Sequence, residues 1–130
     1  MDNVKILLKP IIKKGNKFLI LKRSADDKNR PNCWDFPGGN LEFGENAMEA
    51  LKREIKEESN LSVKNIKPLQ VISEKDKKKN LFWVRIGYTS EYSGGEVKIS
   101  EEHNDYKWVT KAEFLKLESA DYLMEFAKNI

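Results

Sequence analysis

Alternating apolar and polar positions predict that much of this chain is β-sheet. β-Branched and aliphatic residues recur in five segments, and alternation of this kind is typical of strands. Gly15-Asn16, between the first two segments, predicts a hairpin turn. The predicted strands span residues 4–12, 17–23, 61–72 with an interruption at Pro68, 80–92, and 96–99.

A helical period replaces this alternation in residues 47–59. Ala50, Leu51 and Ile55 fall on one stripe of such a helix, and Asn46 before it is a favourable N-cap. The same period returns near the C-terminus, where Thr110 is an expected N-cap. The predicted C-terminal helices span residues 111–117 and 120–128.

Three carboxylates lie close together on the first predicted helix. Glu54, Glu57 and Glu58 fall within an arc of roughly 100°. They repel one another, and they lie in the second half of the helix, where its dipole disfavours negative charge. A solvated surface face is one explanation. A site for divalent cations is the other, because hard cations such as Mg²⁺ bind carboxylate oxygens.

The surroundings of these glutamates favour the metal site. Glu54 and Glu58 flank the apolar stripe, so they border the buried face of the helix. Gly38-Gly39 precedes the helix and lets the backbone approach a ligand closely. The sequence therefore predicts a cation site between a glycine turn and the helix.

The spacing of these residues resembles the Nudix box, G-x5-E-x7-R-E-U-x-E-E-x-G-U, in which U is a bulky aliphatic residue. The match spans residues 39–61, with Glu45 and Arg53-Glu54 at the specified positions. Asn60 stands where the pattern has Gly. We expect Asn60 to end the helix in the left-handed conformation, because Asn is the next most tolerant residue.

This resemblance implies the Nudix fold, an α/β/α sandwich with a mixed β-sheet, in a single domain over residues 1–130. It implies a cytoplasmic hydrolase that cleaves phosphoanhydrides with Mg²⁺, for which Mn²⁺ can substitute. The resemblance also assigns roles within the box. Arg53 pairs with Glu45, and the metal ligands are the Gly39 carbonyl and the side chains of Glu54, Glu57 and Glu58.

Segments beside the box extend the resemblance. Residues 34–39 read W-x-F-P-G-G, and both aromatic side chains are expected in the core. Glu102 and Trp108 form an E-x5-W pair, as in MutT-type members, which implies that Glu102 binds a metal or accepts the proton of the attacking water. Glu101 is the less favoured choice. His103 is an alternative base, although a lone loop histidine is more often only exposed to solvent.

Four residues outside the box are candidate substrate contacts. Arg23, with Lys22 second, closes a strand where family members often meet phosphate, and an exposed strand end is the alternative. Phe82 is a candidate for stacking on a nucleobase, although core packing is the usual role of strand aromatics. Asp121 lies where some relatives read the base, and an acid at a helix start is the simpler explanation.

Composition further narrows the class of protein to which this chain can belong. The chain has 130 residues, a formal net charge of +3, and one cysteine. This balance argues against a stable nucleic-acid partner, and Cys33 cannot form an intramolecular disulfide, which suits a reducing compartment. No segment resembles a transmembrane helix or signal peptide. We expect a monomer or homodimer that acts on a small nucleotide.

The expected reaction converts a nucleoside triphosphate, including oxidised forms such as oxidised dGTP, to the monophosphate and pyrophosphate. ADP-ribose or another nucleotide sugar is the alternative substrate, and dinucleoside polyphosphates and capped RNA ends stay open. A Nudix module that binds nucleotides without hydrolysis is the rival from another class. All three box glutamates are present, and this disfavours the rival.

Overall fold

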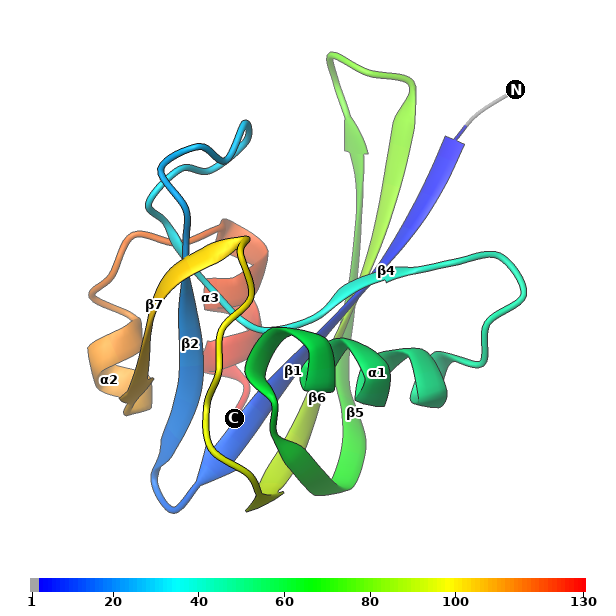
Figure 1. The fold of residues 1–130 in the computed structure, drawn as a ribbon. Coiled ribbons are helices and arrows are strands. Elements are labelled where there is room, and N and C mark those ends of the chain that lie inside the picture. The colour runs from blue at the N-terminus through cyan, green and yellow to red at the C-terminus, as the bar shows by residue number, and fades with distance from the viewer. Residues whose placement is uncertain (1–2) are drawn as a thin grey trace.

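The computed structural model describes residues 3–130, in which seven strands form one mixed sheet and three helices pack around it (Figure 1). The sheet order is β3-β2-β1-β6-β5, while β4 pairs with β1 and β7 with β2. The elements are β1 (Asn3–Lys14), β2 (Lys17–Arg23), β3 (Trp34–Asp35), β4 (Gly39–Leu41), α1 (Ala47–Ser59), β5 (Ser62–Asp76), β6 (Leu81–Gly94), β7 (His103–Val109), α2 (Lys111–Phe114) and α3 (Asp121–Lys128).

Strand β1 is the centre of the sheet. It runs parallel to β6 from Asn3 to Lys13 and antiparallel to β4 and β2, so the predicted mixed sheet is confirmed. The predicted hairpin joins β1 to β2 with Gly15 at φ 66°. The two strands pair only beside this turn and diverge beyond it, as Figure 1 shows. The segment from β3 to β4 crosses between the diverging strands.

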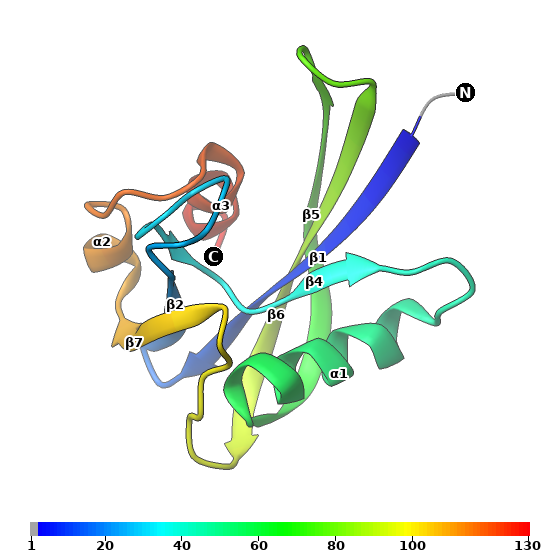
Figure 2. The same cartoon turned by 45° about the horizontal axis from the view of Figure 1, so that its top comes forward.

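Alternate residues of β1 and β2 build two cores on opposite faces of the sheet. Leu8 and Leu19 pack with Leu51 and Ile55 of α1. On the other face, Ile11, Phe18 and Ile20 pack with residues of α2 and α3. Figure 2 shows α1 and the C-terminal helices on different sides of the central strands. The predicted α/β/α layering is therefore confirmed.

Close packing of α3 depends on a glycine in β6. A Cβ atom at Gly87 would lie 2.9 Å from the ring of Phe126, which is fully buried. A side chain at this position would therefore push α3 away from the sheet. Gly87 fixes how near the residues of α3 come to the strands.

The predicted elements differ from the structure in four places. Residues 96–99 form no strand; their backbone runs along the end of α1, where Lys98 N–H donates to Ser59 O at 3.0 Å. β5 runs through Pro68, because shifts of register absorb the proline. α2 ends at Phe114 and not at 117. β7 was not predicted, because its mostly exposed residues carry little apolar alternation.

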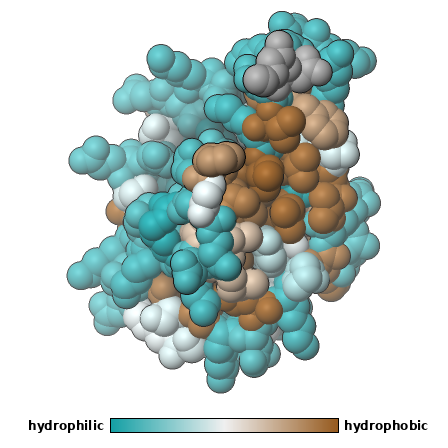
Figure 3. Space-filling model, turned by 90° about the vertical axis from the view of Figure 1, so that its right-hand side faces the viewer, coloured by the Kyte–Doolittle hydropathy of each residue, from teal (hydrophilic) through white to brown (hydrophobic). Residues whose placement is uncertain are grey.

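Apolar side chains gather on the part of the sheet face that α1 leaves uncovered (Figure 3). Val4 of β1 and Phe82 of β6 are register partners, and both are exposed. Phe82 thus lies on the α1 side of the sheet and not among the residues of the α3 side. Among the helices of residues 3–130, none is long and apolar enough to cross a membrane.

Candidate functional site

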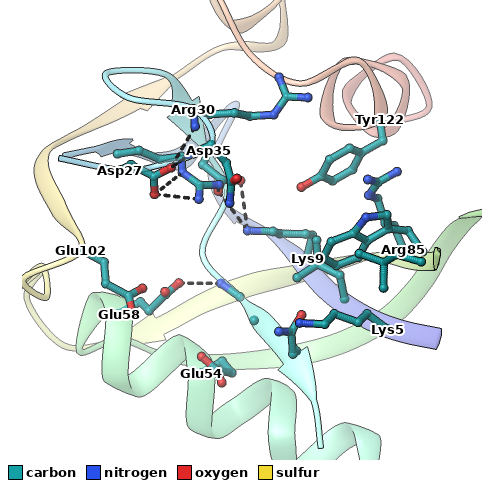
Figure 4. Close-up of a pocket in the computed structure, with 18 of the residues that line it drawn as sticks. Lys5, Lys9, Asp27, Arg30, Asp35, Glu54, Glu58, Arg85, Glu102 and Tyr122 are labelled. Carbon is teal, nitrogen blue, oxygen red and sulfur yellow. Dashed lines mark hydrogen bonds and ion pairs between the residues drawn. The ribbon is translucent and has the colours of Figure 1, made fainter. Parts of the chain in front are cut away.

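A cavity of about 720 Å³ opens on the α3 side of the sheet, between β1, β6 and the segment that crosses from β3 to β4 (Figure 4). Charged side chains of both signs line it. Its acids are Asp27, Asp35, Glu42, Glu54, Glu58, Asp76 and Glu102, and its cations are Lys5, Lys9, Arg23, Arg30, Lys79 and Arg85.

The alternation of the strands places these cations. Lys5 and Lys9 of β1 line the cavity, whereas Leu8 between them packs under α1. Strand β6 follows the same rule, because Trp83 is the register partner of Lys5 and also lines the cavity. Period-2 geometry thus puts a polar row over the cavity and an apolar row under the helix.

Both ends of α1 are held by asparagine side chains. Asn46 accepts hydrogen bonds from the N–H groups of Met48 and Glu49, as predicted. Asn60 has φ 64° and ends the helix in the left-handed conformation, which confirms the expectation for this position. Its side chain donates to Glu96 O at 3.1 Å. These caps fix the extent and position of the helix that carries the box glutamates.

The three box glutamates differ in their surroundings. Glu58 is only 7% exposed, and its Oε1 accepts a hydrogen bond from Gly38 N–H at 2.8 Å. Glu54 also lines the cavity. The Glu57 side chain is 58% exposed and lies 3.4 Å from Arg53. The helix therefore presents two of its three carboxylates to the cavity.

Burial and neighbouring acids perturb these two carboxylates. The pKa of Glu58 is raised to about 8, mainly by burial, with Asp35 and Glu102 adding to the rise and Lys9 and the Gly38 N–H opposing it. Burial also raises the pKa of Glu54, with Glu57 and Glu102 adding to the effect. Glu102 thus acts on both groups. Such a cluster favours either a bound proton or a bound cation.

Gly39 brings the backbone against Glu54. A Cβ atom at position 39 would lie 2.7 Å from the Glu54 carboxylate, so any other residue would displace this carboxylate from its position. Arg53 fixes the loop to the helix, because its guanidinium pairs with Glu45 at 2.9 Å and with Glu54 at 3.1 Å. The predicted Arg53–Glu45 pair is confirmed.

A buried ion-pair network forms the wall of the cavity beside β3. Lys9 pairs with Asp35 at 3.0 Å, and Arg23 bridges Asp35 at 3.2 Å and Asp27 at 2.8 Å. Burial lowers the pKa of Lys9, but Asp35, Tyr122 and Glu58 together outweigh this effect and the net change is upward. Lys9 is therefore charged at neutral pH. Arg23 faces the cavity as predicted, with its position set by two carboxylates.

Of the other candidate residues from the sequence, some line the cavity and some do not. Glu102 lines the cavity beside Glu58 in Figure 4. Lys22, Phe82 and Asp121 are not among the lining residues: Lys22 lies over the ring of Trp34, and Phe82 points to the other face. The cavity thus forms without these three side chains, and their roles as substrate contacts stay predictions.

His103 is not the exposed loop residue that the sequence suggested. It begins β7, is 8% exposed and lines the cavity. Burial lowers the pKa of His103, which leaves the ring neutral at pH 7. Its Nδ1 atom is buried and has no hydrogen-bond partner within residues 3–130. A neutral imidazole beside Glu102 can accept or relay a proton.

A protein-family model described as the NUDIX domain matches residues 7–127. The chain belongs to the Nudix family of hydrolases. The box residues described above are therefore Nudix-box residues in their usual context, a strand and glycine turn followed by a capped helix.

Two curated relatives show the range of activities in this part of the Nudix family. One is an ADP-ribose pyrophosphatase of Methanocaldococcus jannaschii, 39% identical over 94 residues, covering 71% of this chain and 53% of the relative. Another is the nucleoside triphosphatase NudI of Escherichia coli, 31% identical over 109 residues and covering 77% of each protein. The chain thus spans about half the length of the first relative.

Solved structures agree on the Nudix fold. A MutT Nudix hydrolase from Burkholderia pseudomallei has a TM-score of 0.87 and 21% identity, with 99% of each chain covered. The Nudix domain of Shewanella oneidensis NrtR, solved with ADP ribose, has a TM-score of 0.74 and 20% identity, with 98% of this chain and 87% of that one covered. At this identity the likeness establishes the fold.

The Nudix-box residues fit a divalent cation in chemistry. Within residues 3–130, no three His, Cys, Asp or Glu side chains converge as a formed metal site. Glu54 instead pairs with Arg53, and Glu58 accepts the Gly38 N–H. Glu54, Glu58 and Glu102 nevertheless supply hard oxygen donors in one cavity, and Glu102 raises the pKa of both others. A cation would remove that repulsion.

Several residues that line the Nudix cavity were missed by sequence reasoning, and four of them show why. For Lys9 and Asp35 a signal was present, because each is a charge within an apolar run, and buried charges need partners. Arg85 had the same signal inside the most apolar strand. Tyr122 had none, because its neighbour Asp121 is an equally plausible polar position and only the orientation of α3 separates them.

Proposed function

We propose that this chain is a Mg²⁺-dependent hydrolase of a nucleoside diphosphate linked to another group. Its substrate is a nucleoside triphosphate, which it converts to the monophosphate and pyrophosphate. The observation that carries the proposal is the meeting of Glu54, Glu58 and Glu102 with Arg23 in one cavity under an intact Nudix box. The similarity to NudI of Escherichia coli over 77% of both proteins supports a triphosphate.

Glu54, Glu58 and the Gly39 carbonyl are the groups proposed to hold the cation at the cavity floor. Glu57 is the third glutamate proposed as a ligand, and its side chain lies on the exposed side of the helix. When bound, Mg²⁺ neutralises phosphate charge and lowers the pKa of water. Arg53, tied to Glu45 and Glu54, keeps the helix and loop in register.

The remaining residues bind the substrate and move a proton. Arg23 lies at the cavity wall with its guanidinium oriented by Asp27 and Asp35, so it is placed to bind phosphate oxygens. Glu102 is exposed and unpaired by any cation within residues 3–130, which suits it to accept the proton of the attacking water. His103 beside it is the alternative acceptor.

Release of the nucleoside monophosphate from a nucleotide panel tests the proposal. We expect Mg²⁺-dependent, EDTA-sensitive cleavage when dGTP, oxidised dGTP, CTP and ADP-ribose are compared. ADP-ribose is the second candidate, because the Methanocaldococcus jannaschii relative at 39% identity is named for it. An absence of metal-dependent release from every nucleotide would favour a binding module and overturn the proposal.

Two substitutions on α1 make the test specific. We expect Glu57→Gln and Glu54→Gln to lower kcat by about 10²-fold or more with the fold retained, because each removes a proposed metal ligand. Glu49→Gln is the matched control, since Glu49 is an exposed residue in the first turn of the same helix. Full activity in Glu54→Gln would contradict the assignment.

A further inference from the structure

Arg85 occupies the end of the cavity opposite the box glutamates, as Figure 4 shows. Its guanidinium lies over two aromatic rings, with Cζ 5.1 Å from the ring centroid of Trp83 and 4.4 Å from that of Tyr122. The rings come from β6 and α3, so two layers of the fold contact the same guanidinium. The Arg85 side chain is 12% exposed.

The stacked guanidinium keeps most of its donors free. Its Nη1 donates to Glu74 at 2.7 Å. Within residues 3–130, Nε is buried without a partner and Nη2 makes no hydrogen bond. A guanidinium stacked on aromatic rings presents an edge that carries only donors. Nε is covered by protein atoms, so Nη2 and the second N–H of Nη1 are the donors that an acceptor in a ligand can meet.

Strand register sets the distance between this edge and the proposed metal site. Arg85 pairs with Leu7, and Leu7 pairs with Asn40, which follows Gly39. Two strand spacings place the Cα atoms of Arg85 and Asn40 about 10 Å apart. Gly39 contacts the Glu54 carboxylate. A nucleotide with its phosphates at Glu54 would therefore bring its base to Arg85.

We propose that Arg85 determines base specificity by donating to a base edge that carries two adjacent acceptors. Guanine offers O6 and N7 in this arrangement, and cytosine offers O2 and N3. Adenine places an amino donor beside N7, which the donor-only edge of Arg85 cannot satisfy. The inference rests on the proposed function, since it assumes that a nucleotide is the substrate.

A purely structural role for Arg85 predicts something different. If the stack and the Glu74 pair served only to join α3 to β6, loss of Arg85 would affect all nucleotides equally. Base reading instead changes the ratio between nucleotides. The ratio of kcat/KM values for different bases therefore separates the two roles.

The kinetic test compares GTP, CTP, ATP and UTP with the full-length protein and Mg²⁺. We expect the wild-type protein to prefer GTP or CTP over ATP by about tenfold or more in kcat/KM, with the stronger of the two identifying the base. Arg85→Met should bring that ratio close to one, mainly through KM. Arg85→Lys keeps the charge and should also lose discrimination, because it lacks the planar fork.

Lys67→Met is the matched control, because Lys67 is an exposed cation of the neighbouring strand outside the cavity. It should keep the wild-type ratio. Equal loss for all four nucleotides in both Arg85 variants would overturn the inference, as would a wild-type protein that shows no base preference. Either result leaves the proposed hydrolase function standing if the nucleotides are still cleaved.

Equilibrium binding separates failure of this inference from failure of the proposed function. Calorimetric affinities for GMP, CMP and AMP require no turnover. Tighter binding of GMP or CMP than AMP by about tenfold, lost in Arg85→Lys, supports base reading even if no triphosphate is cleaved. Equal affinities for the three, or a preference that survives in Arg85→Lys, would overturn it.

Discussion

Burial of the Glu58 carboxylate among other acids has a thermodynamic consequence at the scale of one residue. Its folded-state pKa of about 8 lies above the usual glutamate value of 4.5. Between these two pH values the folded protein binds a proton that the unfolded chain has lost. The free energy of unfolding therefore falls as pH rises through this window. A cation that replaces the proton would restore the free energy of unfolding that is lost at high pH.

Substitution of Glu58 tests this directly. In EDTA at pH 8, we expect Glu58→Gln to raise Tm by several degrees, about 5 °C, because the amide carries no buried charge. The dependence of Tm on pH between 5 and 8 should also flatten. Thermal melts of both proteins across that range measure it, and a Glu58→Gln protein that melts below wild type at pH 8 would contradict the assignment.

The pair of Lys9 and Asp35 gives a second prediction at this scale. Asp35→Asn leaves the Lys9 ammonium buried without an ionised partner at 3.0 Å. We expect the free energy of unfolding to fall by about 3–5 kcal/mol. Urea denaturation measures it, and Asp27→Asn is the milder control because that carboxylate is more exposed. A loss under about 1 kcal/mol in Asp35→Asn would show that Lys9 is not charged.

The sequence predicted site residues only where residue type and spacing together leave few other roles. The box carboxylates and Arg53 were recognisable because their spacing on a helix has few other uses. Glu102 and Arg23 were recognisable from their place beside the box. The face on which Phe82 lies could not be predicted, because its strand is apolar on both faces and the alternation did not show which face met the cavity.

At the scale of elements, α1 is the part on which the site depends most, and its C-terminal end depends on one residue. Asn60→Ala should cost about 1 kcal/mol or more of unfolding free energy, because alanine disfavours φ 64°. Asn60→Gly is the matched control: it loses the same bond to Glu96 but accepts the conformation. Chemical denaturation of the two variants isolates the backbone contribution, and equal losses would contradict it.

The elements that sequence periodicity predicted are the ones with a buried face. β1, β2, β6 and α1 each bury a regular set of side chains, so their patterns were legible. β7 was not predicted from its periodicity. It is held by pairing with β2, and its own residues are largely exposed, so they show little apolar alternation. Residues 96–99 show the converse, an alternating segment whose Val97 and Ile99 pack against the core without joining a ladder.

For the whole molecule, metal binding should couple to global stability. A ligand that binds only the folded protein stabilises it by about 2.7 kcal/mol at 100 times its Kd. We therefore expect Tm to rise progressively with added Mg²⁺ in wild type, and to stay constant in a Glu54→Gln, Glu58→Gln double variant. Calorimetry measures both, and a rise of equal size in the double variant would place the cation elsewhere.

The cavity itself was beyond sequence reasoning because it is assembled from distant segments. Lys9 meets Asp35 across 26 positions, and Arg85 meets Tyr122 from another layer. No local pattern records such meetings. The box could be predicted because nearly all its chemistry lies within one loop and one helix.

The parallel pairing of β1 with β6 also determines how long β1 stays without its partner during synthesis of the chain. β1 ends at Lys14, and its central partner is complete only at Gly94. At a synthesis rate of about 5–20 residues per second, that interval is roughly 4–16 s. During it, the apolar run from Leu7 to Ile12 has no β6 beside it. The ribosome thus exposes the strand most central to the enzyme well before the strand that protects it.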